Sequence, residues 1–277
     1  MFGSNIQFAR ESESMDADAW VDLDRYPITK AGKGRETLIA TCRHNLRRSA
    51  LCQLPGFLHP DALHLLADES RDVAPRAIRR NTERSAYLWL KEEHYPADDP
   101  RGWLQHDRKG TVHYDLYPPD CSIQRLYEWE PLTRFVADVL EEDSLFICAD
   151  EVMSVVLSVM KEGDEHGWHF DTNDYAISLC LQNSEAGGEF VCFPYIRDEE
   201  EENFEAVKAV FRGDQEPPVS VVFAPGTLTI FRGRRSLHRV NHAVGHRDRL
   251  MAIFSYHREP GFTWPERAIR MSKGLGS

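Results

Sequence analysis

The chain has 277 residues, of which 42% are hydrophobic and 28% charged. This mixture is typical of a globular protein and excludes a disordered or collagen-like chain. The formal net charge of -12 argues against a nucleic-acid partner, because binding to phosphates depends on clustered lysine and arginine. No stretch approaches the roughly 18 apolar residues that a membrane span needs, so we expect no membrane partner.

The cysteines and the N-terminal segment indicate the compartment. The segment lacks the cationic start, the apolar stretch and the cleavage site of a secretory signal. The six cysteines include no C-x-x-C pair, and several lie in apolar segments. We therefore expect reduced, buried thiols in a cytoplasmic protein. The sequence leaves the oligomeric state open.

The N-terminal half is predicted to be helical and irregular. Residues 1–33 are polar with little periodicity, which favours an irregular arm. Residues 34–143 are expected to supply helical support and loops. Three helices are predicted in this region from apolar residues at helical spacing, over 35–50, from Pro60 and from Pro131. Residues 51–58 predict a short strand and a turn. Residues 71–120, rich in charge, tyrosine and proline, are expected to be mostly loop.

After Ser144 the apolar pattern changes from a helical period to a period of two. Tyr175, Ile177 and Leu179 alternate with small or polar residues. Further strand-length pieces bounded by glycine, proline or charge follow in GGEFVCFP, VSVVFAPG, GTLTIFRG and RLMAIFSY. Between them lies the segment 197–218, whose run of acidic residues, 198–202, is expected to be a solvated loop.

These patterns predict an α+β fold and a single domain over 34–277. Its core, over 144–260, is expected to be an antiparallel double-stranded β-helix, a jelly-roll of cupin-like type, covered by the N-terminal helical layer. Residues 261–277 are expected to form a C-terminal tail.

The segment HGWHFDTND (166–174) contains candidate metal ligands. His169 and Asp171 are two positions apart, so on an extended chain both side chains point to the same side. A third ligand should come from another strand, and His238, after the Gly-bounded strand GTLTIF, is the natural candidate. Two histidines and one carboxylate on one face form the facial triad of non-haem Fe(II) oxygenases. His242 and His246 are the competing histidines for the third position.

An arginine opens the next apolar strand at Arg249. A guanidinium group can bind a carboxylate through two parallel hydrogen bonds, so an arginine here suits the far end of a dicarboxylate. Arg247 competes for this role because it follows Gly245 in a G-x-R pattern.

Residues 145–260 resemble the Fe(II)/2-oxoglutarate-dependent dioxygenases. The resemblance lies in HGWHFD, LCLQ, GGEFVCFP, PGTLTIFRG, SLHRV and GHRDRLMAIFSY. It is nearest to the bacterial branch that hydroxylates or halogenates small, often free, amino acids. It implies that His169, Asp171 and His238 bind Fe(II) and that Arg249 binds the distal carboxylate of 2-oxoglutarate.

The resemblance also implies the reaction. Fe(II), 2-oxoglutarate and O2 would together hydroxylate an unactivated C–H bond of a small substrate, such as an amino acid or a metabolite derived from one. His166 and Glu151 are candidate substrate contacts, Glu151 for a substrate ammonium group. The arginine-rich segment 76–87 is a candidate contact for a substrate carboxylate.

Three alternatives remain open. In halogenases of this branch a small residue replaces the carboxylate ligand so that chloride can bind, and Asp171 argues against this chemistry. A prolyl-hydroxylase-like enzyme would act on protein. A non-catalytic, cupin-like metal-binding protein would explain the triad but would leave Arg249 without a role.

Overall fold

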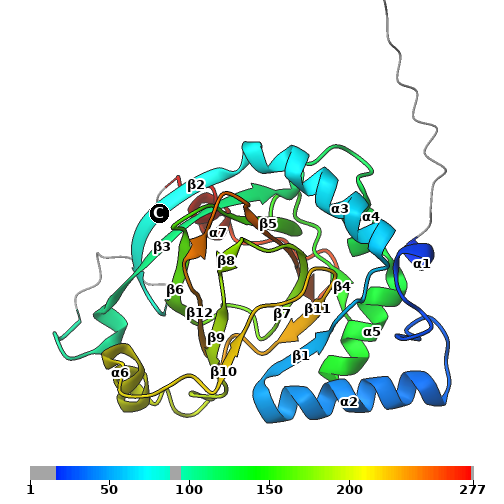
Figure 1. The fold of residues 1–277 in the computed structure, drawn as a ribbon. Helices are drawn as coiled ribbons and strands as arrows, with labels where there is room; N and C mark the ends of the chain where they lie inside the picture. Colours follow the sequence, from blue (N-terminus) through cyan, green and yellow to red (C-terminus); the bar gives the residue numbers. More distant parts are fainter. Residues whose placement is uncertain (1–16, 88–94, 276–277) are drawn as a thin grey trace, which may run out of the picture.

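The computed structural model describes residues 17–87 and 95–275. They form an α+β fold in which a strongly curled antiparallel sheet is covered along one side by helices (Figure 1). The α-helices of the described residues are α1 (Ala17–Trp20), α2 (Lys33–Ser49), α3 (Pro60–Val73), α4 (Ser122–Glu128), α5 (Glu130–Leu140), α6 (Phe204–Arg212) and α7 (Glu266–Ser272). Short 3-10 helices lie at Ala74–Arg76, Pro100–Gly102 and Tyr114–Leu116.

Eleven strands of the described chain share the large sheet, in the order β1-β11-β7-β14-β5-β3-β6-β12-β9-β10, with β2 paired to β3. Their bounds are β1 (Leu51–Leu54), β2 (Ile78–Ser85), β3 (Leu104–His113), β5 (Val155–Met160), β6 (Glu165–His169), β7 (Ala176–Gln182), β9 (Phe190–Phe193), β10 (Val219–Val221), β11 (Leu228–Phe231), β12 (Leu237–Val240) and β14 (Arg249–Phe254). Two small two-stranded sheets pair β13 (Ala243–Val244) with β8 (Ala186–Gly187), and β15 (Tyr256–His257) with β4 (Phe146–Ile147).

On the central strands, alternate side chains face two environments, the hydrophobic core and a cavity inside the curl. On β7, Ile177 and Leu179 pack into the main hydrophobic core, whereas Ser178 lines a cavity inside the curl. On β14, Leu250 packs into the core, and Met251 lines the cavity. Successive side chains of a strand point to opposite faces, so one sequence pattern builds both the core and the cavity wall.

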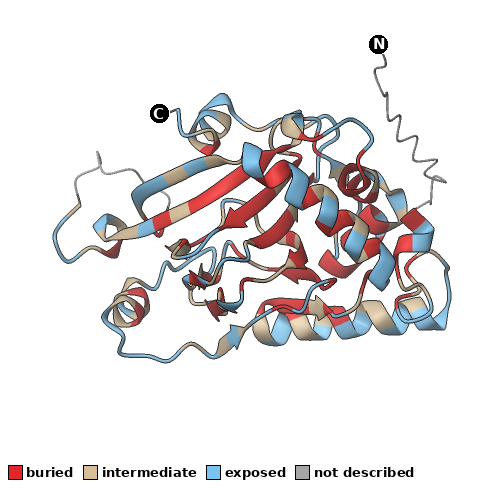
Figure 2. Cartoon of the chain, turned by 45° about the horizontal axis from the view of Figure 1, so that its top comes forward, coloured by how far each residue is buried: buried red, intermediate tan, exposed pale blue. Residues whose placement is uncertain are grey.

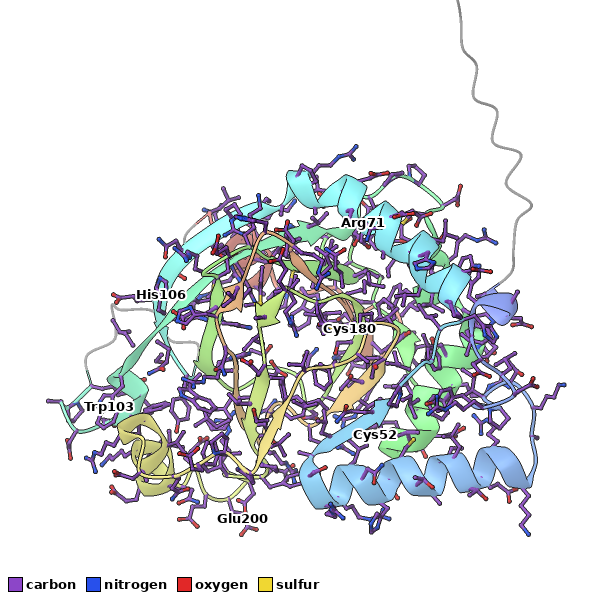
Figure 3. The ribbon with its side chains drawn as sticks, in the orientation of Figure 1. Cys52, Arg71, Trp103, His106, Cys180 and Glu200 are labelled. Atoms are coloured by element: carbon purple, nitrogen blue, oxygen red, sulfur yellow. The ribbon has the colours of Figure 1, made fainter. Side chains whose placement is uncertain are left out.

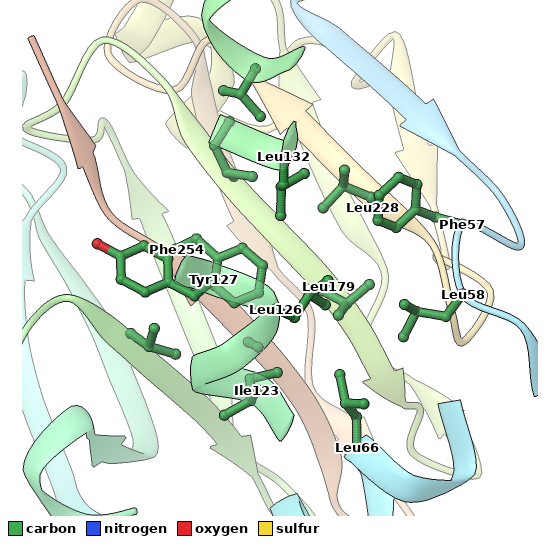
Figure 4. Close-up of a cluster of buried hydrophobic side chains, with 14 of the residues drawn as sticks. Phe57, Leu58, Leu66, Ile123, Leu126, Tyr127, Leu132, Leu179, Leu228 and Phe254 are labelled. Atoms are coloured by element: carbon green, nitrogen blue, oxygen red, sulfur yellow. The ribbon is translucent and has the colours of Figure 1, made fainter. Parts of the chain in front are cut away.

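The main core joins this sheet to the helical layer. Ile123 from α4 and Leu132 from α5 are fully buried in the same cluster as Leu179 and Leu228 (Figure 4). Figure 2 shows the buried strands inside the molecule, while the outer face of α2 remains exposed. The jelly-roll core and its helical layer, predicted from periodicity, are confirmed.

Two predictions for the N-terminal half are wrong. Residues 71–120 are not mostly loop, because β2 and β3 pair over eight positions within this segment. Their sequences are largely polar, so no apolar alternation marks them. Residues 17–33 are not an arm, because Trp20 and Ile28 are buried in the main core. Their apolar residues follow no regular period. Residues 1–16 lie outside the described part.

Two further segments and the cysteines were also predicted from the sequence. The acidic stretch 198–202 is exposed, as predicted, and α6 follows it. The C-terminal tail contains α7. All six cysteines are buried and free, as predicted, and Cys180 from β7 lies inside the curl (Figure 3). None of the described helices is long and apolar enough to cross a membrane.

Candidate metal centre and adjoining cavity

The strand register brings the two predicted histidines together. His169 ends β6 and lies opposite His238 on β12, and Asp171 follows two residues beyond the strand. The Asp171 Oδ1 atom lies 3.7 Å from His169 Nε2 and 3.6 Å from His238 Nε2. One ligand atom from each of the three residues lies within 4.8 Å of the others. This spacing allows all three side chains to bind one ion.

Backbone carbonyl groups fix the orientation of both imidazole rings. His169 Nδ1 donates to Gly167 O at 2.8 Å, and His238 Nδ1 donates to Ser236 O at 2.9 Å. These bonds leave each Nε2 atom free to act as a metal ligand. Burial lowers the pKa of His238, and it lowers that of His169 well below its usual value. Both rings are therefore neutral at pH 7, the state that a ligand histidine requires.

The Asp171 carboxylate is held in place with one buried oxygen unsatisfied. Asp171 donates its backbone N–H to Gly233 O at 3.2 Å, and its Oδ2 atom is buried without a hydrogen-bond partner. A β-carbon on Gly233 would overlap this carboxylate, so the close approach needs a glycine. An orphaned carboxylate oxygen beside two neutral imidazoles fits a divalent metal ion.

Arg249 is buried at the start of β14, with 5% of its surface exposed. Within the described residues the one hydrogen-bond partner of its guanidinium group is the Met160 sulfur, 3.9 Å from Nη1. It lines the same cavity, of about 150 Å³, as His169, Asp171 and His238. A buried guanidinium without a carboxylate partner is costly, and a ligand carboxylate in this cavity would neutralise it.

The residues that compete with His238 and Arg249 for their predicted roles lie outside this cavity. Arg247 donates to the carbonyl oxygens of Asn183 and Ser184 and does not line this cavity. His246 is 94% exposed in its side chain and His242 is 61% exposed. Neither histidine belongs to the group of possible metal ligands.

The two predicted substrate contacts have different positions. His166 is beside the metal group, with its ring stacked on His169 at a centroid distance of 3.8 Å. Burial lowers its pKa well below the usual value. Glu151 is exposed and lines neither this cavity nor the larger one beside it.

A charged cluster on β2 and β3 was missed by sequence reasoning, apart from the suggestion that segment 76–87 binds a carboxylate. Lys109 lies opposite Arg80 in the strand register, and its Nζ atom is 2.9 Å from His166 Nδ1. Arg84 contacts the same ring at Nε2. Asp107 Oδ2 lies 3.3 Å from Arg84 and 3.7 Å from Arg80. Arg80 and Arg84 are four residues apart, a spacing that places them on one face of a strand.

A larger cavity of about 430 Å³ adjoins the metal group. The two cavities share the lining residues Lys109, Ser158 and Ile253. Its walls come from β2, β3, β5 and β14, and from the segment that includes α7. A cavity of this size suits a small-molecule ligand.

Solved structures of low sequence identity share this fold. An oxidoreductase of the 2OG-Fe(II) oxygenase family from Burkholderia pseudomallei is 17% identical, with 84% of this chain and 94% of that chain covered and a TM-score of 0.52. AviO1 from Streptomyces viridochromogenes Tue57 is also 17% identical, with 85% and 100% covered and a TM-score of 0.54. The α-ketoglutarate-dependent epimerase SnoN from nogalamycin biosynthesis is 12% identical, with 80% and 83% covered and a TM-score of 0.54. No curated protein matches the sequence.

The chain thus has the fold of the 2OG-Fe(II) oxygenases, together with a His-Asp-His group that could hold a metal ion. Residues 112–265, more than half of the chain, match the family model described as Halogenase D. The chain belongs to this family, and the resemblance drawn from HGWHFD and the strands that follow it is confirmed.

Proposed function

We propose that this protein is an Fe(II)- and 2-oxoglutarate-dependent oxygenase that hydroxylates a C–H bond of a small molecule. One observation carries the proposal. A His-Asp-His group and a buried arginine without a carboxylate partner line a single cavity. A metal site alone would not need Arg249, whereas a dicarboxylate cosubstrate needs a cation for its distal end. This separates the proposal from a non-catalytic metal-binding protein.

Four residues have distinct proposed roles. His169, Asp171 and His238 would hold the metal, and Arg249 would bind the distal carboxylate of 2-oxoglutarate. When bound, Fe(II) with 2-oxoglutarate and O2 supplies the oxidising power to functionalise an unactivated C–H bond. The aromatic rings of Phe190 and Phe231 lie 5.6 and 4.7 Å from the His238 ring and exclude water from that side. The substrate would occupy the larger cavity, which suits an amino acid or a metabolite derived from one.

Halogenation is the second candidate, because the family model carries the name of a halogenase. Asp171 favours hydroxylation. Its carboxylate would take the ligand position that chloride needs, and its negative charge would repel an anion. The fit of Asp171 against Gly233 supports a ligand position built for a carboxylate.

The proposal can be tested by following 2-oxoglutarate consumption. The full chain with Fe(II) and O2 should convert 2-oxoglutarate to succinate and CO2, faster when a metabolite pool contains the substrate. Mass spectrometry should then find a product with one added oxygen. Arg134→Gln, an exposed arginine on α5, is a suitable control beside Arg249→Gln. Binding of Fe(II) without cosubstrate turnover would contradict the proposal.

A further inference from the structure

The turn 233–236, between β11 and β12, gives a backbone carbonyl group to two of the three proposed metal ligands. Gly233 O accepts a hydrogen bond from the backbone N–H of Asp171 at 3.2 Å. Ser236 O accepts a hydrogen bond from Nδ1 of His238 at 2.9 Å. The positions of both ligands therefore depend on the position of this turn.

Arg197, in the segment that follows β9, holds the turn. Its Nε atom donates to Arg234 O at 2.8 Å, and its backbone N–H donates to Arg235 O at 3.3 Å. Both acceptors lie between the two carbonyl groups that contact the ligands. The Nη1 atom also donates to Glu202 Oε2 at 2.8 Å, and the side chain is 14% exposed. Charge-assisted hydrogen bonds in two directions thus fix the plane of this guanidinium group.

The same guanidinium group packs on the ring of Phe170, the residue between His169 and Asp171. The Cζ atom of Arg197 lies 3.8 Å from the ring centroid. The ring is part of a buried hydrophobic cluster and does not line the metal cavity. A cation over an aromatic ring is attracted to it, and more strongly where water is excluded. The contact therefore holds the short segment that carries two of the proposed ligands.

Asp171 needs such support more than the two histidines do. His169 and His238 are paired across β6 and β12, so the strand ladder fixes their separation. Asp171 lies beyond the end of β6, where this pairing has stopped. Its distance from the histidines depends on the contact between its own segment and the turn 233–236. Arg197 touches both of these parts of the chain.

We propose that Arg197 is a positioning residue for the metal group, which keeps Asp171 within reach of an ion by holding Phe170 and the turn 233–236 together. Arg197 does not line the metal cavity, so it acts through these two neighbours. Groups that orient metal ligands from outside typically change metal affinity by about 10–100-fold when they are removed. The inference rests on the proposed function for the presence of a metal ion, and it is independent of the reaction.

The chain offers a matched control in Arg239. Its Cζ atom lies 4.8 Å from the ring centroid of Trp168, which directly precedes His169. In the described part of the chain its guanidinium group makes no hydrogen bond to the turn 233–236, and its Nε atom has no partner. Arg239→Met therefore removes a cation from a ring beside a ligand without removing a link between the two segments.

The test measures metal binding by the full chain under anaerobic conditions and without 2-oxoglutarate. Fe(II) gives the affinity, and Co(II) gives a visible spectrum that depends on the geometry of its ligands. Arg197→Met should weaken Fe(II) binding by about 10–100-fold and change the Co(II) spectrum. Arg239→Met should leave the Fe(II) affinity within about twofold and the spectrum unchanged. If Arg197 served only the stability of the fold, its variant would unfold at a lower temperature but bind both ions normally.

A double-mutant cycle tests whether Arg197 acts through Phe170. Phe170→Leu should also weaken Fe(II) binding, and the double variant should lose less affinity than the two single losses combined, because both changes break one contact. Arg197→Lys keeps the charge but cannot make the planar set of hydrogen bonds. Its Fe(II) affinity should be intermediate, and it carries the test if Arg197→Met does not fold.

Normal Fe(II) affinity with an unchanged Co(II) spectrum in Arg197→Met would overturn the inference. An equal loss of affinity in Arg239→Met, or fully additive losses in the double variant, would also overturn it. Because binding is measured without 2-oxoglutarate, a protein that binds Fe(II) but never turns over this cosubstrate would contradict the proposed function alone. An unmodified protein that binds no Fe(II) would contradict both.

Discussion

His169 and His238 lie directly opposite each other on β6 and β12, with their ring centroids 4.0 Å apart. Each ring donates its Nδ1–H to the carbonyl group two residues earlier in the chain. A shift of the register by one residue would turn His238 to the other face of the sheet. The pairing of two strands that are distant in sequence therefore sets the geometry of the proposed metal site.

His238→Ala should lose most Fe(II) and most turnover while the fold survives, because two remaining ligands cannot hold the ion in a facial arrangement. His169→Ala should behave in the same way. Iron content by elemental analysis, with circular dichroism as the folding control, checks both. His242→Ala is the matched control, since its side chain is exposed. Loss of iron from His242→Ala with normal content in His238→Ala would reverse the assignment.

Arg249→Ala should weaken 2-oxoglutarate binding by roughly 2–5 kcal/mol, the range for breaking a buried hydrogen-bonded charge pair, and leave iron content unchanged. Arg247→Ala should have little effect, because this side chain contacts backbone carbonyl groups away from the cavity. Titration of 2-oxoglutarate into both iron-loaded variants decides between them. A larger loss of affinity in Arg247→Ala would show that Arg247, rather than Arg249, binds 2-oxoglutarate.

Asp171→Gly should lose most hydroxylation and gain little or no chlorination. The change opens a ligand position for chloride, but halogen transfer also needs a substrate radical placed nearer the halide, which this cavity is not shaped to provide. Products formed in excess chloride are identified by mass spectrometry. A chlorinated product from the unmodified enzyme would contradict the assignment as a hydroxylase.

Gly233→Ala should lower iron content without unfolding the protein. The new methyl group would overlap the Asp171 carboxylate and displace it from the two histidines. Gly34→Ala on α2 is the control, since its methyl group would meet only Pro27 at an ordinary contact distance. That variant should be neutral or up to about 1 kcal/mol more stable, because alanine favours a helix over glycine. Equal iron content in both variants would show that Asp171 tolerates the displacement.

His113 should make stability depend on pH. Burial lowers its pKa to about 4, so the folded state binds this proton less readily than the unfolded state. Its contribution to the free energy of unfolding is complete above about pH 6.5 and is lost as the pH falls toward 4. Chemical denaturation at pH 7.5 and 4.5 should show a loss smaller by about 2–3 kcal/mol in His113→Gln than in the unmodified protein. An equal loss would mean that His113 titrates normally.

The strands of the core and the positions of the candidate ligands could be predicted because apolar residues alternate there. Ile177 and Leu179 mark β7, and the H-x-D spacing places His169 and Asp171 together. Arg249 was predictable as the first residue of an apolar strand. These features depend on short stretches of sequence, in which the spacing of the residues determines the side to which their side chains point.

The charged cluster on β2 and β3 could not be predicted from apolar periodicity. Arg80, Arg84 and Lys109 lie on strands whose sequences are largely polar, and their shared face depends on the pairing of β2 with β3. The contact of Asp171 with Gly233 likewise joins segments distant in the chain. The domain boundaries and the cytoplasmic location stay predictions.

The most direct test of the account supplies 18O2, Fe(II), 2-oxoglutarate and chloride to the full chain with a metabolite pool. The account predicts a product that carries one 18O atom and no chlorine, formed in step with succinate and absent without 2-oxoglutarate. A chlorinated product, or an oxygenated product formed equally well without 2-oxoglutarate, would contradict it.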